Sequence, residues 1–256
     1  MPIQVRPLTK ADIPGAVDVI QQAFAEDPYF RWVFDEKSFN KTRNYGSLEA
    51  RCLWGIENAI FHVAVDTDTD TDTEDAAEST SSAPGATDNK SPGEILGVSC
   101  WLAPHPLSQP ESWYSWAQSW ALWFRQGLNN IRHGGRGGLN VRRYYIWKER
   151  QAEAQKSIWD DERGYYFCNI VAVRPEAQGR GVGRKLFEEV IRVADQEGRR
   201  CYLESSRSEP NVGIYERFGF EMKKVMECQD GQDGEDKSDG DVCMLYCMVR
   251  EPKSSS

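Results

Sequence analysis

The chain has 256 residues, of which 39% are hydrophobic, and it carries a formal net charge of −9. That length suits one large domain or two small ones, with enough apolar residues for a core of ordinary size. Two acidic stretches, residues 66–78 and 227–241, together carry a charge of −13, so the rest of the chain carries about +4. This mild basic excess suits an anionic small molecule and is too weak to predict nucleic-acid binding.

Several classes of protein are disfavoured by what the sequence lacks. No apolar run approaches the roughly 20 residues of a membrane span, and residues 1–10 lack the apolar stretch of a signal peptide. The seven cysteines are odd in number and four stand inside apolar runs, which predicts buried free thiols in a reducing compartment. No Cys-x-x-Cys pair occurs and the three histidines are far apart. We therefore expect a cytoplasmic protein with no metal site and no membrane contact.

Apolar runs predict the strands of a mixed sheet, and apolar residues three or four positions apart predict its helices. In chain order, the expected helices begin at Asp12 and then cover residues 41–58, 144–159, 181–198 and 211–219. The expected strands cover residues 3–7, 59–65, 94–102, 165–173, 201–205, 220–226 and 241–249. Strands that alternate with helices, with hairpins at both ends, predict an α/β fold in which helices flank both faces of a twisted mixed sheet.

Two polar stretches interrupt this pattern and offer almost nothing for a core to bury. We expect a single domain over residues 1–252, with a disordered acidic insertion at 66–92, an acidic hairpin loop at 229–240 and a disordered tail at 253–256.

Aromatic residues recur at helical spacing between these stretches. Four tryptophans stand three or four positions apart from Trp113 to Trp123, and Tyr114 and Phe124 lie beside them. Such a stripe usually packs into a core, and the alternative is that it lines a pocket for an apolar or aromatic molecule. A loop rich in glycine and arginine is expected from residue 127 to residue 143.

The most informative stretch runs from Cys168 to Phe187 and has the pattern of a buried strand, a glycine-rich turn and the start of a helix. The first N–H groups of a helix have no partner inside it, and the helix dipole adds positive charge, so such a turn can hold a phosphate. Gly179, Gly181 and Gly183 remove the side chains that would keep an anion from the backbone. The spacing matches neither the dinucleotide fingerprint nor the P-loop.

What stands instead is Gln178-x-x-Gly181-x-Gly183, which resembles the acyl-CoA pyrophosphate loop of the GNAT acetyltransferase superfamily. A second stretch, from Asn211 to Phe220, resembles that family's later helix, which carries an Asn and a Tyr and closes on Gly-Phe. With Glu204-Ser-Ser ahead of it, this stretch is similar to puromycin N-acetyltransferase and its relatives. The resemblance implies the GNAT acyl-CoA N-acyltransferase fold, with acetyl-CoA as the cosubstrate.

The resemblance also implies which residues bind the cosubstrate. The strand end would pair by its backbone with the pantetheine arm, and a backbone N–H near Val171 would stabilise the thioester oxygen during the reaction. The glycine turn would hold the pyrophosphate, and two residues of the later helix complete the site. These residues are Ile170, Val171, Ala172, Val173, Gln178, Gly179, Arg180, Gly181, Val182, Gly183, Arg184, Asn211 and Tyr215.

Two side chains are expected to be catalytic. Tyr215 would protonate the departing CoA thiolate, which suits a phenol with an ordinary pKa of about 10. Glu204 would take the proton from the attacking amine, and Glu26, Asp27 or a chain of water molecules are the alternatives. The structural alternatives are a core aromatic for Tyr215 and a solvated or paired carboxylate for Glu204.

The reaction we expect is transfer of an acetyl group from acetyl-CoA to the primary amine of a small molecule, by direct attack on the thioester, in a monomer or homodimer. The tryptophan-rich segment favours an enclosed pocket over the open groove that a peptide needs. Three alternatives stay open: a protein or peptide N-acetyltransferase, a non-catalytic CoA-binding regulatory module, and a protein that binds ATP in the glycine turn.

Overall fold

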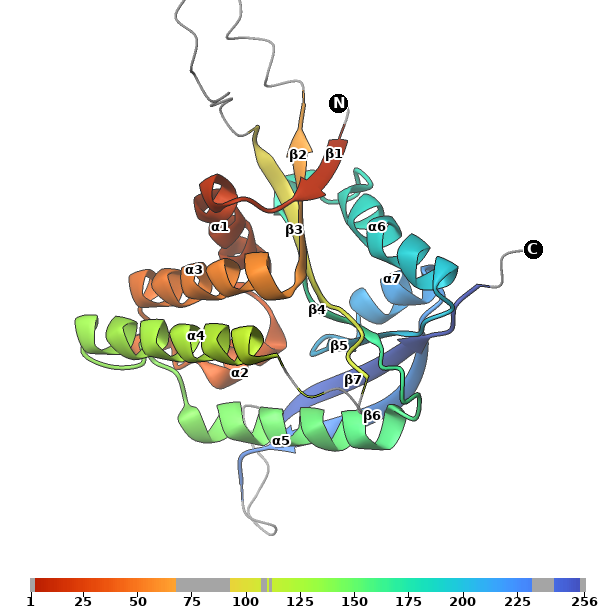
Figure 1. Ribbon diagram of the computed structural model, residues 1–256. Coiled ribbons are helices and arrows are strands. Elements are labelled where there is room, and N and C mark those ends of the chain that lie inside the picture. Colours follow the sequence, from red (N-terminus) through yellow and green to blue (C-terminus); the bar gives the residue numbers. More distant parts are fainter. Residues whose placement is uncertain (1–2, 68–92, 107–109, 111, 232–241, 254–256) are drawn as a thin grey trace, which may run out of the picture.

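The computed structural model describes residues 3–67, 93–106, 110, 112–231 and 242–253 (Figure 1). The predicted insertion, hairpin loop and tail lie almost entirely outside the described residues. The predicted starts of these three segments, at residues 66, 229 and 253, need correction. Asp66 and Gln229 end strands, and the Asp66 N–H donates to the Glu94 carbonyl, because strand pairing continues past the last apolar residue. Lys253 likewise belongs to the described chain, and its N–H donates to Asp195.

Seven strands of the described chain form one mixed sheet in the order β1-β2-β3-β4-β5-β7-β6. Only β4 and β5 are parallel, and the other neighbours are antiparallel. All seven strands expected from the sequence are present. They are β1 (Ile3–Pro7), β2 (Ile60–Asp66), β3 (Ile95–Leu102), β4 (Tyr166–Val173), β5 (Cys201–Ser205), β6 (Glu221–Gln229) and β7 (Val242–Arg250).

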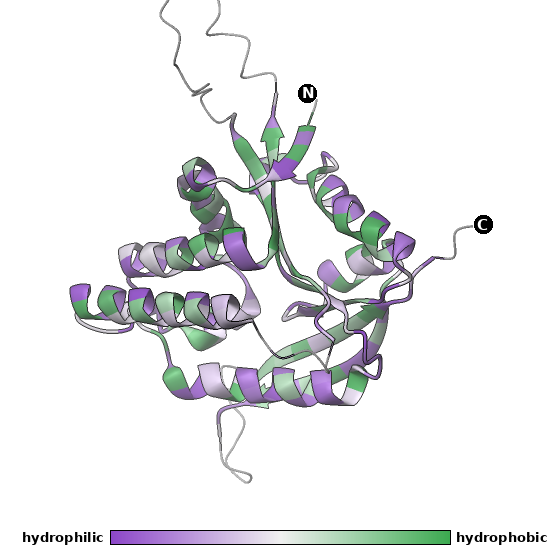
Figure 2. Cartoon of the chain, in the orientation of Figure 1, coloured by the Kyte–Doolittle hydropathy of each residue, from purple (hydrophilic) through white to green (hydrophobic). Residues whose placement is uncertain are grey.

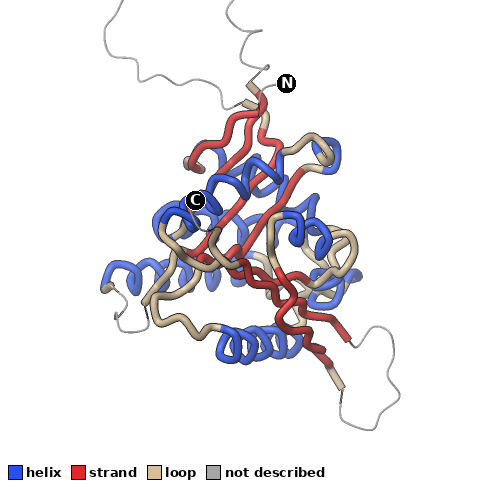
Figure 3. The backbone as a smooth tube through the Cα atoms, turned by 90° about the vertical axis from the view of Figure 1, so that its right-hand side faces the viewer, coloured by secondary structure: helices blue, strands red, loops and turns tan. Residues whose placement is uncertain are grey.

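Helices flank both faces of this sheet, as predicted (Figures 1 and 3). One face is covered by α1, α2, α3 and α5, and the other by α6 and α7, while α4 packs on the outer side of α3. The helices are α1 (Ile13–Phe24), α2 (Pro28–Val33), α3 (Lys41–Asn58), α4 (Trp113–Arg132), α5 (Val141–Ile158), α6 (Val182–Gln196) and α7 (Asn211–Arg217). The sequence did not predict α2, which is too short to show a period, and α4 continues into the range expected to be a loop.

Each face of the sheet has its own apolar core, and apolar residues line both sides of the strands (Figure 2). The side chains of β4 change faces along the strand. Tyr166 and Cys168 belong to the core under α6, but Ile170 and Ala172 belong to the core under α1. The register skips Asn169 at this point, so Asn169 is the extra residue of a β-bulge. The seven cysteines are buried free thiols, as predicted.

A buried ion pair ties β1 to the start of α1. The Asp12 carboxylate is 1% exposed and accepts from both terminal nitrogens of Arg6, at 2.6 and 2.7 Å, and from the backbone and hydroxyl of Thr9. Burial opposes the charged form, but the bonds from Arg6 and Thr9 outweigh it and hold the pKa of Asp12 below its ordinary value.

Asp12→Ala is expected to lower the free energy of unfolding by about 3 kcal/mol, because it removes the buried carboxylate that pairs with the Arg6 guanidinium. Urea unfolding would measure the loss, with Asp18→Ala on the exposed side of α1 as the control. Since the folded-state pKa is depressed, the contribution is present above the ordinary pKa and is lost as the pH falls through the folded value. Equal stability of the two variants would contradict this role.

Candidate active site

The two parallel strands at the centre of the sheet part after three residues. Only Tyr166, Phe167 and Cys168 of β4 pair with β5, and β4 then continues along β3 to Val173. Beyond Cys168 its other edge has no strand beside it in the described chain, and the residues from Asn169 to Val171 are partly or fully exposed. The peptide groups on this edge can therefore pair with an extended ligand that enters the fork between β4 and β5.

The glycine turn follows directly on β4 and leads into α6. Gly179 and Gly181 adopt positive φ angles of 74° and 82°, which L side chains rarely adopt, and Gly181 is the N-cap residue of α6. A Cβ placed on either glycine would meet no atom within 4 Å, so the space above the turn is open. Val182 is buried below the turn and fixes it to the core. The turn therefore presents the N-terminal N–H groups of α6 to open space, which suits an anion.

The basic residues of the turn all contact other parts of the protein. The Arg180 guanidinium lies 3.9 Å from the buried Asp66 carboxylate, and Arg184 pairs with Glu188 at 2.6 Å. Lys185 donates from Nζ to the Ile3 carbonyl of β1 at 2.8 Å. The two arginines expected at the phosphates are thus paired with carboxylates in this structure, while the backbone N–H groups of the turn face open space.

The later motif forms α7, on the same side of the sheet as α6. Asn211 donates from Nδ2 to the Ser205 hydroxyl at 3.4 Å, so it is bonded to the end of β5. The Tyr215 ring packs near Phe187 of α6, with ring centroids 5.8 Å apart. Burial raises the pKa of the Tyr215 phenol above its ordinary value, and the Cys168 thiol and the Asp27 carboxylate add to the rise. A phenol in such a place stays protonated and can donate.

Glu204 lies on the opposite face of the sheet from Tyr215. Its carboxylate accepts hydrogen bonds from the Gln151 and Gln155 amides of α5 and from the Tyr202 hydroxyl at 2.8 Å. These three donors hold the carboxylate beneath α5. The structure does not bring Glu204 and Tyr215 together in one hydrogen-bond network.

A second carboxylate, Asp27, lies at the junction of α1 and α2. It is 9% exposed and accepts from the Tyr29 N–H at 2.9 Å and from the Ser206 hydroxyl, just beyond β5, at 2.7 Å. No lysine or arginine of the described chain forms an ion pair with it. Asp27 was only one of several alternatives from the sequence, because nothing in a linear pattern connects it with Ser206 or Tyr215.

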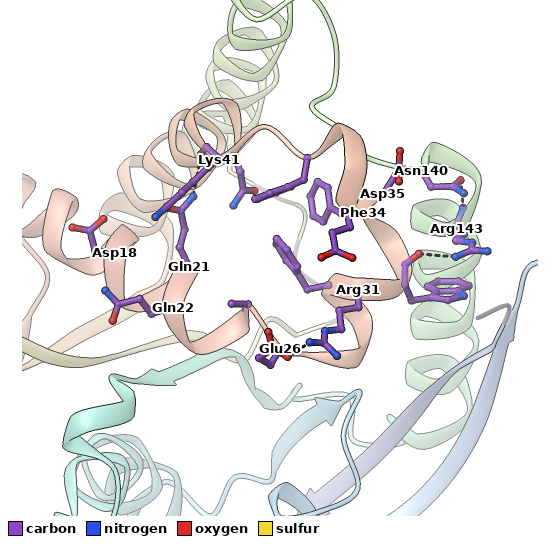
Figure 4. Close-up of a pocket in the computed structure, with 16 residues that line it drawn as sticks. Asp18, Gln21, Gln22, Glu26, Arg31, Phe34, Asp35, Lys41, Asn140 and Arg143 are labelled. Atoms are coloured by element: carbon purple, nitrogen blue, oxygen red, sulfur yellow. Dashed lines mark hydrogen bonds and ion pairs between the residues drawn. The ribbon is translucent and has the colours of Figure 1, made fainter. Parts of the chain in front are cut away.

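A pocket elsewhere in the described part of the chain is not lined by the motifs. It has a volume of about 890 Å3 and lies between α1, α2, α3 and the start of α5 (Figure 4). Charged groups of both signs and several aromatic rings line it, and Glu26 in its wall pairs with Arg31. Because neither the glycine turn nor the fork contributes to this pocket, we assign it no part in the site.

The described residues offer neither a metal site nor a membrane span. No group of three or more His, Cys, Asp or Glu side chains there is arranged to hold a metal ion. None of the described helices is long and apolar enough to cross a membrane.

Part of the chain matches a known family model and a curated relative. Residues 142–222, from α5 into β6, match the family model described as an acetyltransferase (GNAT) domain. An uncharacterised N-acetyltransferase of Schizosaccharomyces pombe is 30% identical over 169 residues, which cover 64% of this chain and 60% of that protein. The chain thus matches about three fifths of the length of this relative.

Solved structures share the fold. Arylalkylamine N-acetyltransferase 2 from Aedes aegypti superposes with a TM-score of 0.56 at 14% identity, and 99% of this chain and 100% of that chain are covered. The polyamine N-acetyltransferase of Drosophila melanogaster, which forms N-acetylagmatine, gives 0.55 at 13% identity, with 98% and 100% covered. The chain thus contains a match to a GNAT acetyltransferase domain over residues 142–222 and shares the fold of these solved acetyltransferases.

Proposed function

We propose that the protein transfers an acetyl group from acetyl-CoA to the primary amine of a small molecule, by direct attack of the amine on the thioester. The observation that carries the proposal is the fork between β4 and β5, which opens onto the glycine turn at the N-terminus of α6. An exposed strand edge followed by an anion-binding turn fits an extended thiol carrier that ends in a pyrophosphate.

On the α6 side of the sheet, the proposed residues would bind the carrier as follows. The peptide groups from Ile170 to Val173 would pair with the pantetheine arm, and the N–H groups between Gln178 and Arg184 would hold the pyrophosphate. The N–H near Val171 would stabilise the developing oxyanion. Tyr215 would then donate its proton to the departing thiolate, and Asn211 would hold the neighbouring loop through Ser205.

On the opposite side, the acceptor amine would meet Asp27. A buried carboxylate without a cationic partner favours a ligand that brings its own positive charge, such as an ammonium group. The rings of Tyr29 in α2 and Trp147 in α5 lie 4.5 Å apart, so these two helices close over this side. This closure favours a small amine over an extended peptide. The prediction of an enclosed pocket lined by the tryptophan-rich segment was wrong, because its four tryptophans are 54 to 79% exposed.

Asp27→Asn is expected to raise the KM for a primary amine about 10- to 100-fold while leaving the affinity for CoA unchanged, because it removes a charged hydrogen-bond partner. Mass spectrometry would first identify acetylated products from a panel of small amines and a peptide mixture. The matched control is Glu26→Gln, an exposed neighbour that pairs with Arg31. Acetylation of the peptides alone would favour a protein acetyltransferase, and CoA binding without any product would favour a regulatory module.

The base that takes the amine proton is proposed to be Glu204, with Asp27 as the alternative. Comparing the pH dependence of kcat/KM in Glu204→Gln and Asp27→Asn separates them, because the acidic limb of the profile disappears in the variant that lacks the base. The seven reduced thiols support a cytoplasmic location, and we propose a single folded domain.

A further inference from the structure

Helix α4 has its amphipathic pattern reversed. None of its residues from Trp113 to Arg132 is buried, although it contains four tryptophans. Polar side chains form the hydrogen bonds that join it to α3, whereas a surface helix usually turns its large apolar residues inward.

The inward face of α4 is held to α3 by hydrogen bonds. Gln126 accepts from the Ser47 hydroxyl at 2.8 Å and donates to the Ser47 carbonyl at 2.9 Å. Asn129 donates to the Arg43 carbonyl at 2.8 Å, and Asn130 accepts from the Arg43 guanidinium at 2.6 Å. These specific bonds fix which side of α4 faces α3 and which side faces outward.

The outward side carries large apolar residues, which we call the α4 aromatic face. Its four tryptophans keep 54 to 79% of their surface exposed, and neighbouring rings touch edge to face. The members of the face are Trp113, Trp116, Trp120, Trp123, Phe124, Leu128 and Ile131. Aromatic side chains offer roughly 150–250 Å2 each, so at these exposures the face presents roughly 800 Å2. A typical monomer has no exposed apolar patch of that size.

We propose that the α4 aromatic face is the interface of a homodimer, in which α4 packs antiparallel against α4 of a second copy. The patch area matches the roughly 800 Å2 that each partner of a stable complex buries. The tryptophans also follow the alternating three- and four-residue spacing of a coiled-coil seam, which continues at Gly127. A Cβ on Gly127 would meet nothing within 4 Å, so this position leaves a hole in the seam.

Antiparallel pairing makes this seam complementary to itself. A two-fold axis between residues 121 and 122 places Trp116 opposite Gly127 and Trp120 opposite Trp123 of the second copy. Trp116 then packs into the space left by Gly127, and the rings of Trp120 and Trp123 meet at the centre of the interface. The charged residues of α4 are Arg125 and Arg132. In a parallel pair of helices each arginine would stand opposite its own copy and the like charges would repel, whereas antiparallel pairing separates them.

Charge argues against a membrane as the occupant of this face. Helices that lie in a bilayer surface carry many basic residues, whereas α4 has two, and the whole chain has a net charge of −9. The fork and α7 lie across the molecule from α4 (Figure 1), so the dimer leaves both copies of the acetyl-transfer site accessible.

The mass of the full chain in solution tests the dimer. Sedimentation equilibrium at micromolar concentration is expected to give twice the chain mass, and Trp120→Glu is expected to give the monomer mass with unchanged circular dichroism. The control is Val225→Glu on β6, which removes an apolar side chain that is 46% exposed and should remain dimeric. A monomer mass for the wild-type protein would overturn the proposal. If that monomeric protein also sediments with anionic vesicles, the α4 aromatic face would be assigned to membrane binding instead.

Cross-linking tests the register. The native cysteines are buried, so a bifunctional maleimide selects exposed thiols introduced by substitution. A mixture of Trp116→Cys and Gly127→Cys chains is expected to cross-link, because these positions face each other. Either variant alone should cross-link poorly, since like positions lie roughly 16 Å apart along antiparallel helices. Efficient cross-linking of each variant with itself would overturn the antiparallel arrangement.

Discussion

Gly181→Val is expected to weaken the binding of CoA by at least about 100-fold. The φ angle of 82° at this residue is strained for any side chain, at a cost of roughly 1–3 kcal/mol. The added side chain would also fill the open space above the first N–H groups of α6, where the pyrophosphate is proposed to lie. Isothermal titration calorimetry with CoA measures the affinity directly.

The control for this experiment is Gly198→Val. Gly198 follows α6 at its other end and has a φ of 60°, and a Cβ placed on it would also meet no atom within 4 Å. Its substitution should cost comparable stability without changing the affinity for CoA. Wild-type affinity in the Gly181 variant, with the fold intact, would remove the turn from the binding site and would undermine the proposed function.

Tyr215→Phe is expected to lower kcat about 10²- to 10³-fold with little change in the affinity for CoA, because it removes only the proton donor. The packing of the ring near Phe187 remains. Steady-state rates with saturating acetyl-CoA, together with calorimetry, measure the two effects separately. Tyr145→Phe, an exposed tyrosine of α5, is the matched control and should keep the wild-type rate.

The pH dependence gives a second test of Tyr215. Because burial raises its pKa, the phenol stays protonated as the pH rises through the ordinary value of about 10. The wild-type rate should therefore persist through that pH and fall only when Tyr215 itself ionises. If kcat of the phenylalanine variant equals that of the wild type across the whole pH range, Tyr215 is not the acid.

Sequence patterns predicted the strands and the long helices of the sheet layers well. The strand from Tyr166 to Val173 and the helix after it combine a buried apolar run, a glycine turn and a strong helical period, which are all local signals. The glycine turn was predictable for the same reason, since its shape depends on backbone conformations that glycine allows. Short α2 had no such signal.

The aromatic stripe of α4 shows where periodicity fails. The period correctly predicts a helix, but it cannot say which side faces inward. Polar bonds from Gln126 and Asn129 to α3 decide the orientation, and they join residues about eighty positions apart. The expectation of a core or a pocket lining was therefore wrong.

The arrangement around the fork was equally hidden from the sequence. The bulge at Asn169 reverses the faces of β4 without any glycine or proline to mark it. Asp27 reaches Ser206 across 179 positions, and Glu204 meets α5 rather than solvent. Motifs thus predicted which residues to consider, while long-range packing determines which of them face each other. The catalytic assignments remain predictions.

The burial of all seven cysteines has a practical consequence for an assay of the proposed activity. Burial raises the pKa of each of these thiols, so the native chain offers scarcely any thiolate to a chromogenic disulfide reagent. In an assay of the proposed reaction, the increase in absorbance of this reagent would then come from the released coenzyme. A slow increase in a control without substrate would instead report chains that have unfolded enough to expose their cysteines.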